Sequence, residues 1–311
     1  MAALYRLDDA IVHYEWNNAL PPQLTIDPGD TVVFRTRDAA DRFYSRASTS
    51  EDVLRRGPFK GHPLAGPVHV RGAAPGDALI VDVVAMRPTL DFGWTAVRPG
   101  RGLLPEADFP KPYLQIWDLS DGQYARCPGV AVPLAPFPGV MGTALEEPGG
   151  HSTMPPRKNG GNMDIKQLGV GSTVALPVGV DGALFSVGDG HGAQGDGEVC
   201  VTAVEMCAEI TLRFDLARDR RLPEPRFRVH GALPGATDPG PWVATTAHGP
   251  DLFAAAQQAV RYMIEHLVHE RGLSREAAYV ICSVAADLKI SEIVDAPNWI
   301  VSAFLSESIF V

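Results

Sequence analysis

The sequence predicts a mainly β protein with an α+β part towards the C-terminus, and three observations lead to this fold class. First, the chain of 311 residues contains 31 glycines and 27 prolines, which is more helix-breaking residues than a helical bundle tolerates. Second, short segments rich in β-branched residues recur through the first 220 residues. Third, apolar residues at helical spacing follow residue 250. We therefore expect residues 1–220 to form a domain that carries the site, with an α+β part at 221–311 packed on it.

Strands are expected where a short β-branched or apolar run lies between turn residues. Along the chain these runs are 24–26, 31–36, 68–70, 78–86, 172–178 and 183–187, with one or two more strands in 198–214. The proline-rich segment 87–170 leaves room only for short strands. So much irregular chain in a compact domain is typical of a segment that builds a site or an interface.

The spacing of apolar residues changes in the C-terminal part of the sequence. From Asp251 onwards the apolar residues follow one face of an α-helix, at Leu252, Ala256, Val260, Met263 and Leu267. Gly272 is expected to end this helix, and Ser274 to cap a second one that runs to about residue 286. Residues 220–250 are expected to form a connector with a strand or two, and the apolar segment 300–311 a packed strand.

The amino-acid composition limits the kinds of molecule that the protein is expected to bind. With 27 Lys and Arg against 37 Asp and Glu, the net charge of −10 argues against nucleic acid or an anionic membrane. No apolar stretch approaches the roughly 18 residues of a membrane-spanning helix, and no signal peptide is visible. Four scattered cysteines without a C-x-x-C pair are expected to be reduced. We expect a cytoplasmic protein without nucleic-acid or membrane partners, and a homodimer or higher homo-oligomer.

The segment 186–198, with the sequence SVGDGHGAQGDGE, is the first candidate site. Its five glycines allow sharp turns and close approach to a ligand. Its groups that bind metals or move protons are Asp189, His191, Gln194, Asp196 and Glu198. Asp189 and His191 point the same way if the backbone is extended, and carboxylate with imidazole suits a catalytic divalent cation. The alternative is a Gly-Asp turn with solvated polar residues, which the density of titratable groups argues against.

Two further candidates lie upstream. In GGNMDIK, Asp164 either completes a metal site, acts as a general base or holds a ligand histidine, or it only caps an ordinary loop. His62, before a proline at a loop-to-strand passage, is either a ligand or a structural residue.

Cys200 and Cys207 lie in apolar runs and are expected in the core. Since the nucleophile elbow and the P-loop are also absent, an activated water fits better than a covalent nucleophile.

Several ordered strings resemble the acetamidase/formamidase family. They are HPLAGPVHVRGAAPGDALIVDV, VPLAPFPGVMGTA, GGNMDIKQLGVGSTVALPVGVDGALFSVGDGHGAQGDGEVC and TAVEM. The resemblance runs from about Trp16 to Leu216, and more loosely through the C-terminal region. It implies hydrolysis of a short aliphatic amide to its carboxylate and ammonia. It also implies a jelly-roll-like β-sandwich with an added α+β part, and a metal-dependent site in an oligomer. The family has alanine where this chain has Gly190 and Gly192, changes expected to loosen the loop.

The resemblance also implies roles for individual residues. The metal ligands it implies are Asp189 and His191, with Asp164 or His62 as the third. The cation is expected to be Zn²⁺, with Ca²⁺ as the alternative. Glu198 is the candidate general base, which then protonates the departing ammonia, and Asp164 is a further catalytic candidate. Gln194 or a glycine N–H would stabilise the oxyanion.

Two other classes of function stay open at this point. One is a different metal-dependent C–N hydrolase or lyase on the same scaffold. The other is a non-catalytic β-sandwich binding protein, although a pure binding face rarely carries so many titratable groups.

Overall fold

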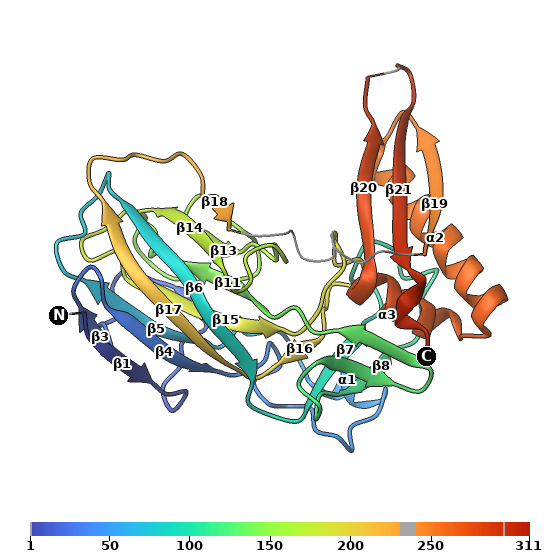
Figure 1. Cartoon of the computed structure of the whole chain (residues 1–311), viewed down its shortest axis with the longest axis horizontal. Helices are drawn as coiled ribbons and strands as arrows, with labels where there is room; N and C mark the ends of the chain where they lie inside the picture. The colour runs from blue at the N-terminus through green and yellow to red at the C-terminus, as the bar shows by residue number, and fades with distance from the viewer. Residues whose placement is uncertain (1, 231–240, 295) are drawn as a thin grey trace.

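The computed structural model describes residues 2–230, 241–294 and 296–311, and two large sheets make up most of it (Figure 1). The first sheet has the strand order β1 (Leu4–Leu7), β4 (Thr31–Thr36), β17 (Ala208–Ala217), β6 (Ala78–Pro88), β14 (Ser172–Pro177) and β18 (Arg226–Val229). The second has the order β10 (Val130–Pro133), β9 (Tyr124–Cys127), β8 (Tyr113–Asp118), β7 (Phe92–Val97), β16 (Glu205–Met206), β15 (Phe185–His191), β11 (Phe137–Gly142) and β13 (Gly160–Asn162). Short elements complete this part of the chain: β5 (Leu64–Val70) pairs with β15, β3 (Leu24–Ile26) pairs with β5, β2 (Glu15–Trp16) pairs with β12 (His151–Ser152), and α1 is Asp52–Arg55.

Three buried aromatic rings show that the two sheets pack against each other. Phe34 and Phe214 belong to β4 and β17 of the first sheet, and Phe185 belongs to β15 of the second. The ring centroid of Phe185 lies 6.2 Å from that of Phe34 and 5.0 Å from that of Phe214. Strand β14 alternates buried and half-buried residues, as expected of a strand with one face on a core. The mainly β prediction is confirmed.

The C-terminal part has its own sheet and two helices, which stand beside the large sheets (Figure 1). Its strand order is β19 (Trp242–Gly249), β21 (Trp299–Ser306) and β20 (Ala286–Glu292), with α2 (Leu252–Arg271), α3 (Arg275–Ala285) and the 3₁₀ turn Glu307–Ile309. Asp251 caps α2 by accepting from two backbone N–H groups, and Gly272 ends it at a φ of 65°. Ser274 caps α3. The expected helices and their limits are confirmed.

None of the helices within the described ranges has the length and apolar character needed to cross a membrane.

The expected strands are also confirmed, with one difference at the site. The proline-rich segment holds only short strands, and the run 198–214 contains β16 and β17. Part of the expected connector, residues 231–240, lies outside the described residues. The first half of the glycine-rich segment is not a loop but β15, which pairs with β11, β16 and β5. Its glycines allow this close packing, since a Cβ on Gly190 would lie 2.8 Å from the Cβ of Ala208.

Candidate active site

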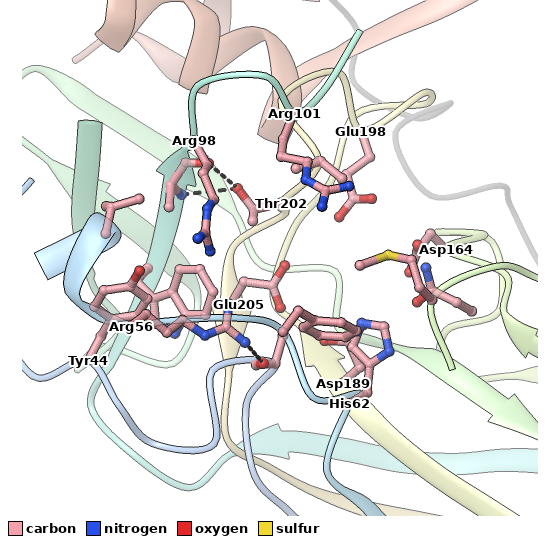
Figure 2. A pocket seen from close by; sticks show the side chains of 18 of the residues that line it. Tyr44, Arg56, His62, Arg98, Arg101, Asp164, Asp189, Glu198, Thr202 and Glu205 are labelled. Atoms are coloured by element: carbon pink, nitrogen blue, oxygen red, sulfur yellow. Dashed lines mark hydrogen bonds and ion pairs between the residues drawn. The ribbon is translucent and has the colours of Figure 1, made fainter. Parts of the chain in front are cut away.

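A pocket of about 620 Å³ brings the expected site residues together (Figure 2). His62, Asp164, Asp189 and Glu198 all contribute to its lining. They come from β15, from the loop that follows it, and from segments that precede β5 and follow β13. Residues more than a hundred positions apart in the chain thus share one cavity, which the spacing of the sequence alone could not establish.

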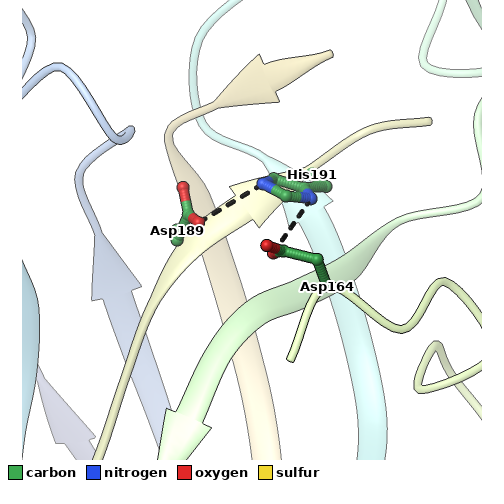
Figure 3. Close-up of side chains that lie close together, drawn as sticks. All are labelled: Asp164, Asp189 and His191. Carbon is green, nitrogen blue, oxygen red and sulfur yellow. Dashed lines mark ion pairs between the residues drawn. The ribbon is translucent and has the colours of Figure 1, made fainter. Parts of the chain in front are cut away.

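Asp189 and His191 form the centre of the cluster. The Oδ2 atom of Asp189 lies 3.3 Å from the Nε2 atom of His191, although the φ of 56° at Asp189 departs from the extended backbone on which the expected alignment of the two side chains rested. Asp164 approaches the other side of the ring, with 3.9 Å between its Oδ1 atom and the Nδ1 atom of His191 (Figure 3). Asp189 and His191 are buried, so their charges must be balanced by one another or by a ligand.

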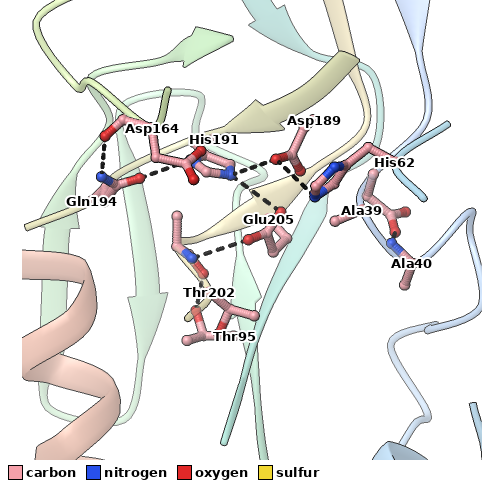
Figure 4. Close-up of polar contacts among 12 residues, drawn as sticks. Ala39, Ala40, His62, Thr95, Asp164, Asp189, His191, Gln194, Thr202 and Glu205 are labelled. Carbon is pink, nitrogen blue, oxygen red and sulfur yellow. Dashed lines mark hydrogen bonds and ion pairs between the residues drawn. The ribbon is translucent and has the colours of Figure 1, made fainter. Parts of the chain in front are cut away.

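His62 and Glu205 extend the cluster (Figure 4). The Nε2 atom of His62 lies 3.7 Å from Asp189 Oδ2, and its Nδ1 atom lies 3.0 Å from the Oγ1 atom of Thr153. Glu205 Oε2 lies 3.5 Å from His191 Nε2. Sequence reasoning missed Glu205, although it is the single acid in the otherwise apolar run 199–208, which was a usable signal. A carboxylate buried in a strand needs a partner of opposite charge.

Gln194 determines which nitrogen of His191 carries a proton. Its Nε2 atom donates to the backbone carbonyl of Asp164 at 2.8 Å, and its Oε1 atom lies 2.9 Å from His191 Nδ1. Since a carbonyl only accepts and Gln Oε1 only accepts, Nδ1 of His191 must be the donor. His191 Nε2 therefore faces the carboxylates of Asp189 and Glu205 and can satisfy them only through a bound proton or a cation.

The unsatisfied atoms of the cluster favour a cation. Among the described residues, four buried atoms of this cluster have no hydrogen-bond partner: Asp164 Oδ1, Asp189 Oδ1, His191 Nε2 and Glu205 Oε2. Ligand atoms of Asp164, Asp189 and His191 lie within 4.8 Å of one another, as do those of His191, Glu198 and Glu205. One proton could satisfy only part of this set. Carboxylate oxygens and a neutral imidazole nitrogen together are ligands of a divalent cation, so the residues present fit one.

Burial and neighbouring charges shift the pKa values of the acids in the cluster. Burial raises the pKa of Asp164 to about 7, with the charge of Asp189 adding to the effect. Burial also raises the pKa of Glu205 to about 8. Burial works to raise the pKa of Asp189 too, but the imidazoles of His191 and His62 outweigh it and hold that pKa below its usual range. Carboxylates crowded in this way take up protons unless a cation neutralises them.

Three residues of the site have backbone conformations that L-amino acids rarely adopt. The φ angles of Asp164, Asp189 and Glu198 are 47°, 56° and 42°, all in the left-handed region that favours glycine. Such conformations cost free energy and persist where the surrounding structure enforces them, often at functional sites. The backbone is therefore bent at the three positions where an acidic side chain must be aimed into the pocket.

The C-terminal part holds the loop that carries Gln194 and Glu198. The backbone N–H of Gly195 donates to the carbonyl of Ser283, and that of Leu288 donates to the carbonyl of Asp196. Buried Lys166 forms an ion pair with Asp287 of β20, and its Nζ atom lies 3.6 Å from a carboxylate oxygen of Asp196. The C-terminal part thus positions one wall of the site.

Removing the Lys166 charge should therefore destabilise the protein. In Lys166→Met the Asp287 carboxylate stays buried without its cation, which we expect to lower the free energy of unfolding by about 3 kcal/mol. Thermal or urea unfolding measures this. Lys158→Met is the control, because Lys158 pairs with Glu146 and Glu147 on the surface and should matter much less. If the two variants are equally stable, the ion pair between Lys166 and Asp287 does not stabilise the fold.

The cysteines do not offer a nucleophile. Cys200 and Cys207 are buried, as expected. Burial raises the pKa of the Cys200 thiol to about 11, so little thiolate forms near neutral pH.

A buried group of carboxylates and imidazoles at a pocket is typical of hydrolases that activate water. Comparison with known proteins identifies the family. A model of the Acetamidase/Formamidase family matches residues 4–149 and 146–311, and the chain belongs to this family. It is therefore an enzyme, a hydrolase of linear amides, and the alternative of a non-catalytic binding protein is wrong.

Individual relatives agree with this assignment. A formamidase from Methylophilus methylotrophus is 28% identical, over 97% of this chain and 90% of its own length. The solved structure of a gamma lactamase from Delftia acidovorans is 27% identical and covers 99% of this chain and 93% of that chain, with a TM-score of 0.90. An acetamidase from Bacillus halodurans is 30% identical over 98% of this chain and 100% of that chain, with a TM-score of 0.68.

Proposed function

We propose that the protein hydrolyses short linear amides with a divalent cation held by the buried cluster. The observation that carries this proposal is the set of four buried polar atoms around Asp189 and His191 that have no hydrogen-bond partner in the described part of the chain. His191 Nε2 and Asp189 Oδ2 are the central ligands, with Glu205 added to the expected set of Asp164 and His62. A bound cation of this kind polarises an amide carbonyl and lowers the pKa of water.

Glu198 is the residue best placed to move protons. It is partly exposed in the pocket, while Glu205 and Asp189 are buried. Burial, with the nearby Asp164, raises the pKa of Glu198 well above its usual range. A carboxylate whose pKa is raised towards neutrality can take a proton from the attacking water and give it to the departing ammonia. Figure 2 shows its side chain directed into the cavity.

For Gln194 we propose a positioning role in place of the oxyanion stabilisation first expected. Both polar atoms of its amide are already engaged, one by His191 and the other by the carbonyl of Asp164. Gln194 then acts as a positioning residue that keeps the proton on His191 Nδ1 and leaves Nε2 free for a cation.

Gln194→Leu should consequently weaken cation binding. Loss of a hydrogen-bond partner to a ligand histidine lowers metal affinity by about 10- to 100-fold, and titration of the metal-free protein would measure it. Gln167→Leu is the matched control, because Gln167 lies in the same region but hydrogen-bonds to Asp196. If the two variants bind the cation equally well, Gln194 does not set the tautomer.

The test of the function is ammonia release from formamide, acetamide and propionamide, before and after chelation, with metal content measured on the same sample. Release that chelation abolishes and Zn²⁺ restores is the expected result. Release that persists in a metal-free sample would refute the metal dependence and leave the amidase assignment intact. No release from a sample with stoichiometric cation would exclude these substrates.

Ring opening of a cyclic amide is a second candidate. The gamma lactamase superposes on this chain more closely than the acetamidase does, and the reaction breaks the same type of bond. It would yield an amino acid without free ammonia, so product analysis with a lactam separates it from the first candidate.

The finer expectations about assembly and metal complete the proposal. We propose Zn²⁺ as the cation because imidazole is among the ligands, with Ca²⁺ as the alternative because most donors are oxygens. We propose that the two packed sheets form a jelly-roll-like sandwich and that a boundary near residue 220 separates two structural units. We also propose that the protein works in the cytoplasm as a homodimer or higher homo-oligomer.

A further inference from the structure

The pocket has a basic end that the hydrolysis of formamide or acetamide does not use. Tyr44, Arg56 and Arg98 line it together with the acidic cluster. In Figure 2 these three side chains lie on the side of the cavity opposite Asp164 and Glu198. A cavity of about 620 Å³ is within the range of sites for drug-sized ligands, far more than an acetamide molecule fills.

The two guanidinium groups are held in place without being neutralised. Arg56 donates to the backbone carbonyl of Ala39, and Arg98 donates to the carbonyl of Gly57 at 3.3 and 3.4 Å. Within the described part of the chain, neither forms an ion pair with a carboxylate. This is notable in a chain with ten more acids than bases. A half-buried cation without a counter-charge is unfavourable, and a bound anion would relieve it.

Tyr44 adds a polar group at the same end. The residue is buried and belongs to the lining of the cavity. Burial raises the pKa of Tyr44, and the charges of Arg56 and Arg98 oppose this effect, so both cations lie near the hydroxyl. Arginine presents paired N–H donors in the geometry that suits a carboxylate, and a tyrosine O–H can add a third donor.

Apolar side chains also line the cavity. Val53, Phe59 and Trp94 line the same cavity, and they suit a short chain of methylene groups rather than a polar linker. The cavity therefore combines the acidic, metal-competent cluster with apolar wall residues and with Arg56 and Arg98 on the side opposite Asp164.

We propose that the preferred substrate is an amide whose acyl chain ends in a carboxylate, that is, a monoamide of a short dicarboxylic acid. The amide group lies at the Asp189–His191 cluster, and the carboxylate is bound by Arg56, Arg98 and Tyr44. This inference rests on the proposed function and adds a substrate class to the same site. Arg56 and Arg98 are specificity-determining residues, since they contact the far end of the substrate and not the bond that breaks.

The test compares succinamate with isocaproamide, in which an isopropyl group replaces the carboxylate at almost the same size. We expect kcat/KM for succinamate to be higher by about 10- to 100-fold, the effect of charge-assisted hydrogen bonds, and to fall with ionic strength. Malonamate and glutaramate determine the preferred length. Equal kcat/KM for succinamate and isocaproamide would overturn the inference, and the proposed function would stand. Absence of turnover on every amide, formamide and acetamide included, would overturn the proposed function itself.

Variants connect the preference to the basic end. Arg98→Met should lower the ratio of kcat/KM for succinamate to that for isocaproamide by about tenfold or more, while Arg98→Lys keeps part of it. Arg126→Met is the charge-matched control, because Arg126 pairs with Asp121 on the surface. An unchanged ratio in Arg98→Met would overturn the inference. If Arg98→Met is unfolded, Arg56→Met carries the same expectation, and inhibition by succinate compared with isocaproate reports the binding without turnover.

Discussion

Replacing Glu198 with glutamine is expected to lower kcat on acetamide by about 100- to 10,000-fold, the usual contribution of a general base, while the protein keeps its cation. The reason is the position of the residue. Glu198 lines the cavity and is partly exposed, whereas Asp189, His191 and Glu205 are buried around a common centre. The glutamine keeps the shape of the side chain and removes its ability to accept a proton.

Metal content and kcat of the same Glu198→Gln sample decide between two roles. Because the carboxylate also lies within 4.8 Å of ligand atoms of His191 and Glu205, it could serve as a ligand. Loss of the cation together with activity would assign Glu198 to the ligand set, and full activity would exclude it from both roles. Glu146→Gln is the control, since it removes the same charge from an exposed side chain.

The second large effect is expected at a glycine. A Cβ atom on Gly139 would lie 2.7 Å from Asp164 Oδ1, 2.8 Å from His191 Cε1 and 3.0 Å from Asp189 Oδ2. These distances are shorter than van der Waals contact, so the methyl group of Gly139→Ala must push the three side chains apart. We expect the variant to lose most of its cation and about 100-fold or more of its activity, because small displacements at a reacting centre have effects of that size.

Gly249→Ala provides the control for Gly139→Ala. A Cβ atom at Gly249 meets nothing within 4 Å, and this glycine has no left-handed φ angle. The measurements are elemental analysis of the purified proteins, ammonia release and thermal unfolding. A Gly139→Ala protein with full cation content and full activity would mean that Asp164, Asp189 and His191 do not form the metal site.

Comparison of the expected and observed elements shows where local sequence is informative. The helices end where predicted because their limits depend on nearby residues: Asp251 and Ser274 accept from N–H groups of their own first turns, and Gly272 adopts a left-handed φ. Strands β3 and β4 also match their predicted limits. The conformation of the segment around Asp189 was harder to predict. Its glycines are typical of a loop, but in the structure they lie in β15, which pairs with another strand on each edge.

The sequence by itself determined the mainly β class, the two C-terminal helices and the family, and it predicted six residues of the site: His62, Asp164, Asp189, His191, Gln194 and Glu198. These follow from spacing over a few residues, or from long ordered strings. The tertiary structure alone decided that Glu205 completes the cluster, that Gly139 must lack a side chain, and that Asp287 holds the loop of the site through Lys166. It also decided that Arg56 and Arg98 share a pocket with Asp189. The physical reason is that turns, caps and periodicity act between neighbours, whereas burial and charge compensation act between residues that only the pairing of strands brings together.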